Sequence, residues 1–194
     1  MGDLQNIRHD SPHNLSFSGA SDTTLAVAPE IARFSLGIAP ENLDKAAGAF
    51  GAPIPAKVGG MARTGQSFSL CLGPDEWQLM VPMALANPLA KNFAHLRAEV
   101  PHSLVDITHR QIGLVISGPL ASAIIGAGCP LDLSEMPVNG CARSVLDKVQ
   151  VIIMKTDEHT YHLEIMRSFV PFAGQFLRNA ANQYEAELAL NTTP

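Results

Sequence analysis

The chain has 194 residues, of which 46% are hydrophobic and 16% charged, and its formal net charge is −5. A domain of this length buries roughly 70% of the surface of its unfolded chain, so it needs no disulfide or metal to fold. The apolar content excludes wholesale disorder. Lys and Arg never follow one another directly, and we therefore expect neither a nucleic acid nor an anionic membrane as partner.

We expect a cytoplasmic protein. Residues 1–10 are polar and lack the apolar core of a secretory signal. Residues 113–131 carry no charge, but Gly118, Pro119 and Pro130 divide them into a short strand and a short helix rather than a membrane span. The three cysteines then point to reduced thiols.

The first 29 residues are rich in Ser, Asn, Asp and His and show no sustained periodicity, which predicts a flexible N-terminal arm over 1–29. The folded domain is expected over residues 30–187, followed by a disordered tail over 188–194.

The first half of the domain predicts a strand, a helix, a hairpin and a second helix. Pro40 stands where a first-turn proline belongs, and the turn Gly73–Glu76 joins two alternating stretches. Residues 59–65 are expected to form a glycine-containing loop. The predicted elements are the strand Ile31–Leu36, the helix Glu41–Phe50, the hairpin Gln66–Val81 and the helix Ala84–Val100.

The second half repeats this order after a further strand at Ser103–Thr108. The predicted elements are the strand Ile112–Ser117, a helix from Gly118 to Ile125, a hairpin of Val149–Lys155 and Thr160–Met166, and a last helix from Phe169. The sequence thus predicts an α+β fold made of two strand–helix–strand–strand–helix units, about 31–100 and 104–187, with mixed or antiparallel sheets.

Three residues, His102, Asp106 and His109, invite a metal-site hypothesis. On a strand His102 and Asp106 lie roughly 13 Å apart and His109 points to the other face. We therefore expect no shared metal, and we expect Asp106 to hold a turn or the start of the next strand by hydrogen bonds.

Other reactive side chains also favour a structural interpretation. His159 and His162 flank the second hairpin. His162 is expected on the outward face with Glu164, as a solvated or interface histidine. Cys129 follows a helix C-terminus, which does not activate a thiol, and Cys141 is expected in a loop near Arg143. Cysteines are expected to be buried and inert. Two acidic pairs are expected in solvated turns: Asp75/Glu76 and Asp157/Glu158. No catalytic, cofactor-binding or metal-binding residue is predicted. The segment Gly126-Ala127-Gly128 follows a helix rather than a strand, the wrong context for a phosphate loop.

Several segments carry a family resemblance. They are Ala32–Leu36 (ARFSL), Leu72–Trp77 (LGPDEW), Val105–Leu133 (VDITHRQIGLVISGPLASAIIGAGCPLDL), Cys141–Arg143 (CAR), the hairpin DEHTYHLEI and Arg167–Phe169 (RSF). Taken together, over residues 30–185, they resemble the gamma subunit family of heterotetrameric sarcosine oxidase.

This resemblance implies a non-catalytic structural subunit that assembles with alpha, beta and delta subunits. The implied complex oxidatively demethylates sarcosine to glycine with tetrahydrofolate and O2, giving methylene-tetrahydrofolate and H2O2. FAD, FMN and NAD are expected in the alpha and beta subunits and zinc in the delta subunit, with no cofactor in this chain. The equivalent subunit of a related dehydrogenase of N-methyl amino acids is an alternative.

Asp106–Leu120 also resembles the opening of the folate-binding glycine-cleavage T-protein fold. This implies a related architecture and a rival function, a stand-alone folate-binding aminomethyltransferase. T-proteins place an acidic pair after a Gly-Gly strand, whereas the comparable stretch here, Val149–Met154, is almost wholly apolar. The chain is also about half the usual T-protein length. The resemblance to the gamma subunit is therefore favoured.

Overall fold

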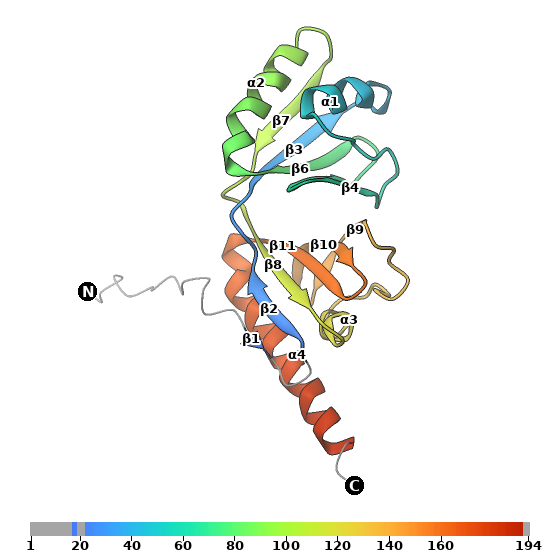
Figure 1. Cartoon of the computed structure of the whole chain (residues 1–194), viewed down its shortest axis with the longest axis vertical. Coiled ribbons are helices and arrows are strands. Elements are labelled where there is room, and N and C mark those ends of the chain that lie inside the picture. Colours follow the sequence, from blue (N-terminus) through green and yellow to red (C-terminus); the bar gives the residue numbers. More distant parts are fainter. Residues whose placement is uncertain (1–16, 19–21, 192–194) are drawn as a thin grey trace, which may run out of the picture.

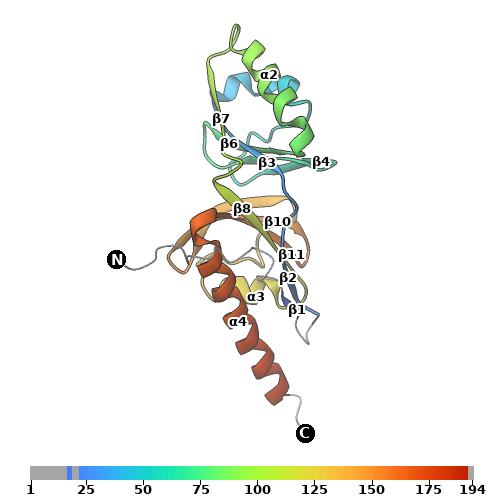
Figure 2. The same cartoon turned by 90° about the vertical axis from the view of Figure 1, so that its left-hand side faces the viewer.

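The computed structural model describes residues 17–18 and 22–191. Within them the chain forms two antiparallel sheets, each covered on one face by helices (Figure 1). The two sheet-and-helix units lie one above the other along the longest axis of the molecule (Figures 1 and 2). The predicted α+β fold is confirmed.

The first unit has the strand order β4-β5-β6-β3-β7. Its helical segments pack on one face, where Phe34, Trp77 and Phe93 are almost completely buried. The elements are β3 (Ala32–Ile38), η3 (Pro40–Asn42), α1 (Leu43–Phe50), β4 (Met61–Thr64), β5 (Ser67–Cys71), β6 (Glu76–Val81), η4 (Met83–Leu85), α2 (Ala86–Leu96) and β7 (His102–Asp106).

The second unit has the strand order β1-β2-β8-β11-β10-β9. Helices α3 and α4 cover the face on which Leu114, Ile153 and Tyr161 are buried. The elements are β1 (Phe17–Ser18), β2 (Thr24–Val27), β8 (Gln111–Ser117), α3 (Ala121–Gly126), β9 (Gly140–Leu146), β10 (Val149–Asp157), β11 (Thr160–Met166), η5 (Arg167–Phe169) and α4 (Val170–Asn191).

The two units exchange one strand each. β2 directly precedes β3 in the chain but pairs with β8 of the second sheet. In the same way β7 precedes β8 but pairs with β3 of the first sheet. The repeating unit is therefore one strand longer at its start than the sequence pattern predicts, and each unit donates that strand to the other.

The faces of the two sheets that carry no helices meet in the middle of the molecule. Met61, Leu70 and Met80 of the first sheet form one apolar cluster with Ile152 and Met154 of the second. An isolated bridge between Gly60 and Gly140 continues this contact at one side. In each sheet, the polar side chains that point away from the helices therefore lie between the two sheets rather than in solvent.

Several boundaries differ from the predictions. Residues 24–27 are strand β2, so the expected arm does not reach residue 29, because β2 pairs with β8. β4 and β9 replace expected loops, since each is an edge strand stabilised by pairing with its neighbour. Helix α4 continues to Asn191, into the expected tail. The remainder of the arm and tail, 1–16, 19–21 and 192–194, falls outside the described residues.

The helix ends follow local sequence. Pro40 opens the 3-10 turn before α1, and Gly51 ends the helix with a left-handed φ of 77°, its N–H bonded to Ala47 O at 2.8 Å. Among the described helices none is long and apolar enough to cross a bilayer.

Candidate polar site between the two sheets

A buried ion cluster joins the two sheets. Arg33 of β3 donates from Nε to Glu164 Oε2 of β11 at 2.6 Å and from Nη2 to Oε1 at 3.0 Å. The same Oε1 lies 2.7 Å from Nε2 of His162, also on β11. The side chains of Arg33, Glu164 and His162 are 4%, 0% and 12% exposed. This bidentate pair is fully desolvated.

The cluster keeps Glu164 ionised. Burial acts to raise the pKa of this carboxyl, but the hydrogen bonds and charges of His162 and Arg33 outweigh it and lower the pKa from its ordinary value of 4.5. The remaining Arg33 donor, Nη1, bonds Ile31 O at 2.8 Å, and the backbone N–H of Arg33 bonds Thr108 Oγ1 at 3.0 Å. Arg33 and Glu164 therefore both have hydrogen-bond partners within the protein, and the ion pair between them holds the two sheets together.

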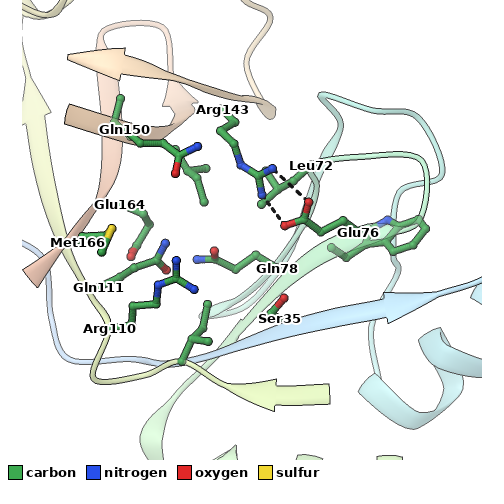
Figure 3. A pocket seen from close by; sticks show the side chains of 14 residues that line it. Ser35, Leu72, Glu76, Gln78, Arg110, Gln111, Arg143, Gln150, Glu164 and Met166 are labelled. Carbon is green, nitrogen blue, oxygen red and sulfur yellow. Dashed lines mark hydrogen bonds and ion pairs between the residues drawn. The ribbon is translucent and has the colours of Figure 1, made fainter. Parts of the chain in front are cut away.

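A second ion pair crosses the same interface nearer the surface. Arg143 of β9 contacts both carboxylate oxygens of Glu76 of β6, with Nη1 to Oε2 at 3.1 Å. Between the two ion pairs lies a cavity of about 270 Å³ whose walls come from both sheets (Figure 3). Its polar walls include Gln78, Arg110 and Gln111.

The hypothetical metal cluster is not assembled. His102 Nδ1 bonds Val100 O at 2.9 Å and its ring packs edge-on against Phe93. Asp106 accepts a hydrogen bond from the N–H of Thr108 at 2.8 Å, which confirms its predicted turn-holding role. His109 is exposed, and its carbonyl accepts from Arg167 Nε at 3.0 Å. No group of three or more potential metal ligands occurs in the described part of the chain.

The cysteine thiols are buried. Cys129 Sγ lies 3.4 Å from Ser144 Oγ. Cys141, which lies on β9 and not in the expected loop, donates to Gly60 O at 3.2 Å. Burial, together with the neighbouring Cys71, raises the pKa of Cys141 to about 11, and burial also raises the pKa of Cys71. Cys141 is therefore a protonated thiol at neutral pH and a poor nucleophile.

The two acidic pairs differ. Asp157 accepts from the N–H of Glu158 at 2.8 Å in an exposed turn, as predicted. Glu76 instead begins β6 and reaches Arg143, because the two sheets stack at this point. The predicted turn position is wrong for Glu76, although its side chain is still 42% exposed. His159 contributes its carbonyl to the N–H of Gly118 at 3.0 Å.

The glycine segment after α3 is a packing feature. A Cβ at Gly128 would lie 2.6 Å from Phe176 Cζ of α4, and the Gly128 carbonyl accepts from Asp147 N–H at 2.7 Å. The absence of a side chain at Gly128 therefore lets α4 pack closely against this segment, and the segment is not a phosphate-binding loop.

The prediction of an outward-facing His162 and Glu164 is also wrong. Strand alternation correctly separates them from Tyr161 and Leu163, but it cannot show that the polar face meets a second sheet. Arg33 is the single charged residue of the segment ARFSL, which is a local sign of a buried partner. Arg33, Glu76, Arg110 and Arg143 all belong to segments that carry the family resemblance, and all four lie at the interface between the sheets.

These features define a class: a duplicated α+β protein whose two sheets pack face to face and are joined by one buried and one partly exposed ion pair. A similar fold is present in the glycine cleavage system aminomethyltransferase T from Bartonella henselae, with a TM-score of 0.62 and 11% identity over 79% of this chain and 44% of that one. At this identity the likeness concerns the fold alone.

The sequence profile of the sarcosine oxidase, gamma subunit family matches residues 40–183, and the chain belongs to this family. It is 26% identical over 142 residues to sarcosine oxidase subunit gamma of Corynebacterium sp. (strain P-1), spanning 72% of this chain and 69% of that one. The protein of strain U-96 is 28% identical over 144 residues, with the same coverage.

A chain of the heterotetrameric sarcosine oxidase from Corynebacterium sp. U-96, solved in complex with pyrrole 2-carboxylate, has a similar structure. The TM-score is 0.78 with 24% identity, covering 90% of this chain and 91% of that chain.

Proposed function

We propose that this chain is the gamma subunit of a heterotetrameric sarcosine oxidase and acts in its assembly rather than in its chemistry. The complex oxidatively demethylates sarcosine to glycine, with tetrahydrofolate and O2 giving methylene-tetrahydrofolate and H2O2. The match of the gamma subunit family over residues 40–183 carries this proposal.

The state of the reactive groups supports a non-catalytic role. Arg33 and Glu164, and likewise Arg143 and Glu76, are paired with each other within the chain, and the Cys141 thiol is protonated. In β10 the residues from Val151 to Met154 are buried and apolar, so they offer no proton-handling group. We assign FAD, FMN and NAD to the alpha and beta subunits and zinc to the delta subunit of a cytoplasmic complex that uses tetrahydrofolate.

An apolar groove supplies a surface for a large subunit. It has a volume of about 430 Å³ and lies between residues 57–60 and the segment 131–142. Val58 is 54% exposed and Leu131 is 37% exposed at its walls, and the neighbouring Val138 is 46% exposed. Large apolar side chains gathered at one place favour a protein partner. We assign the groove to apolar side chains of a flavin-carrying subunit.

Co-expression of the full chain with the alpha, beta and delta subunits tests the proposal. The four chains are expected to co-purify, show flavin absorbance and convert sarcosine to glycine with H2O2. The full chain alone is expected to be colourless and inactive. A complex that forms and works equally well without this chain would contradict its assembly role.

The two alternatives give different results in the same experiment. A complex that oxidises another N-methyl amino acid but not sarcosine would identify the related dehydrogenase. Aminomethyl transfer to tetrahydrofolate by the full chain alone would identify the rival folate enzyme. We test this alternative because the fold is similar to that of a T-protein.

A further inference from the structure

The cavity between the sheets holds polar groups that the protein leaves unused. Gln78 of β6 is 2% exposed, and its Nε2 has no hydrogen-bond partner. Gln111 of β8 has a buried Oε1 that also lacks a partner. A buried unpaired donor or acceptor costs about 1–3 kcal/mol, so two in one cavity indicate a missing bonding partner.

The two amides have complementary needs. Gln78 Nε2 can only donate, and Gln111 Oε1 can only accept. Both side chains point into the centre of the cavity together with Arg110 (Figure 3). A molecule that satisfies them must present an acceptor to Gln78 and an N–H or O–H donor to Gln111.

The charges of the wall determine the sign of that molecule. Glu76 is paired with Arg143, and Glu164 is paired with Arg33. The guanidinium of Arg110 makes no side-chain hydrogen bond or ion pair with any described residue. The wall therefore has one surplus positive charge, held by the side chain best suited to a carboxylate.

We propose that this cavity binds a small organic carboxylate bearing an amide N–H group, of the N-acylated amino acid class. The carboxylate accepts from Arg110 and Gln78, and the N–H donates to Gln111. The volume of about 270 Å³ lies near the small end of the roughly 300–1,000 Å³ range of ligand pockets, which suits such a molecule. No residue lines both this cavity and the docking groove, and the proposal does not depend on the proposed assembly role.

Titration calorimetry of the full chain with hippurate (N-benzoylglycine) tests the proposal. Hippurate is expected to bind, its methyl ester to bind at least about tenfold more weakly, and its N-methyl derivative likewise, because each probe lacks one of the proposed bonds. No binding of hippurate would mean that water alone fills the cavity, and equal binding of acid and ester would exclude a carboxylate site. Either result overturns the proposal.

Two variants locate the bound probe. Arg110→Gln and Gln78→Leu are each expected to weaken hippurate binding by about tenfold or more. Arg63→Gln removes an exposed arginine of β4 that does not line the cavity, and it is expected to leave binding unchanged. Arg110 is exposed, so Arg110→Gln remains informative even where Gln78→Leu unfolds the protein. Equal affinities in the wild type and Arg110→Gln would refute the site.

The titration is repeated on the co-purified assembly. A free metabolite site still binds hippurate there. A carboxylate side chain from a neighbouring subunit that occupies the cavity would instead block hippurate and overturn the assignment to a small molecule.

Discussion

Arg33 and Glu164 stand 131 positions apart in the chain, and their side chains meet at 2.6 Å in the middle of the molecule. Each belongs to a different sheet, so this pair and His162 connect two units that each have their own apolar core. Because both charges are desolvated, the pair fixes how the sheets stack more than it adds to net stability.

Glu164→Gln is expected to destabilise the fold strongly. The substitution keeps the shape of the side chain but leaves the Arg33 guanidinium buried without its counter-charge, which costs about 3–5 kcal/mol. Urea unfolding of the full chain measures the loss. Arg33→Met combined with Glu164→Leu is expected to lose less than the sum of the single changes, since no lone charge remains.

The exposed pair Lys45–Glu99 provides the control. Its atoms lie 3.7 Å apart and its side chains are 54% and 71% exposed. Glu99→Gln is therefore expected to change the free energy of unfolding by no more than about 1 kcal/mol. Equal effects of Glu99→Gln and Glu164→Gln would show that the buried pair has no special role.

Stability is expected to fall in acid because of Glu164. Its pKa is lowered in the folded protein, so the unfolded chain binds a proton first as the pH drops. The contribution is complete above the ordinary pKa of 4.5 and is lost as the pH falls through the lower folded value. Urea midpoints from about pH 7 to about pH 3 measure it, and Glu164→Gln should flatten the decline.

Gly113 of β8 is expected to tolerate no side chain. A Cβ there would lie 2.4 Å from His162 Nε2 and 2.9 Å from Ala28 Cβ, so Gly113→Ala should cost about 1–3 kcal/mol. Gly48 in α1 has nothing within 4 Å of such a Cβ. Gly48→Ala should stabilise by about 0.5–1 kcal/mol through its helix propensity. Thermal unfolding of both variants checks the opposite signs.

The sequence could predict those helices and turns that are determined by residues close together in the chain. Pro40 and Gly51 delimit α1, and the turn at Gly73–Glu76 joins β5 to β6, as the sequence indicates. Strand β2 has only four residues and owes its form to hydrogen bonds with β8, about ninety positions away. No pattern within residues 1–29 encodes that pairing, which explains why an arm is predicted there.

The candidate site depends on contacts that the sequence could not supply. Alternation places Arg33 and Gln78 opposite the helix-covered face, but an exposed face and a face covered by a second sheet have the same period. The polar wall of the cavity is formed by residues of both sheets, so it exists only once the two sheets are stacked. The apolar run of β10 predicts a strand, but it does not predict which polar residues of other elements lie beside that strand.

Cys141 is expected to resist alkylation in the folded protein. Its pKa of about 11 leaves very little thiolate near neutral pH, and its side chain is 3% exposed. Iodoacetamide at about pH 7.5 should therefore label it only after unfolding in urea, as followed by peptide mass spectrometry. Rapid labelling of Cys141 in the native chain would contradict the inert role inferred for it.

The apolar groove is expected to carry the contact with a large subunit. Val58→Asp and Leu131→Asp place a carboxylate in a surface that a partner would desolvate, and each should reduce co-purification by at least about tenfold. Leu85→Asp, on a leucine that is 47% exposed in η4 and does not line the groove, is the matched control. It should leave co-purification intact. Losses as large for Leu85→Asp as for Val58→Asp would place the interface elsewhere, and no loss for either groove variant would exclude the groove from assembly.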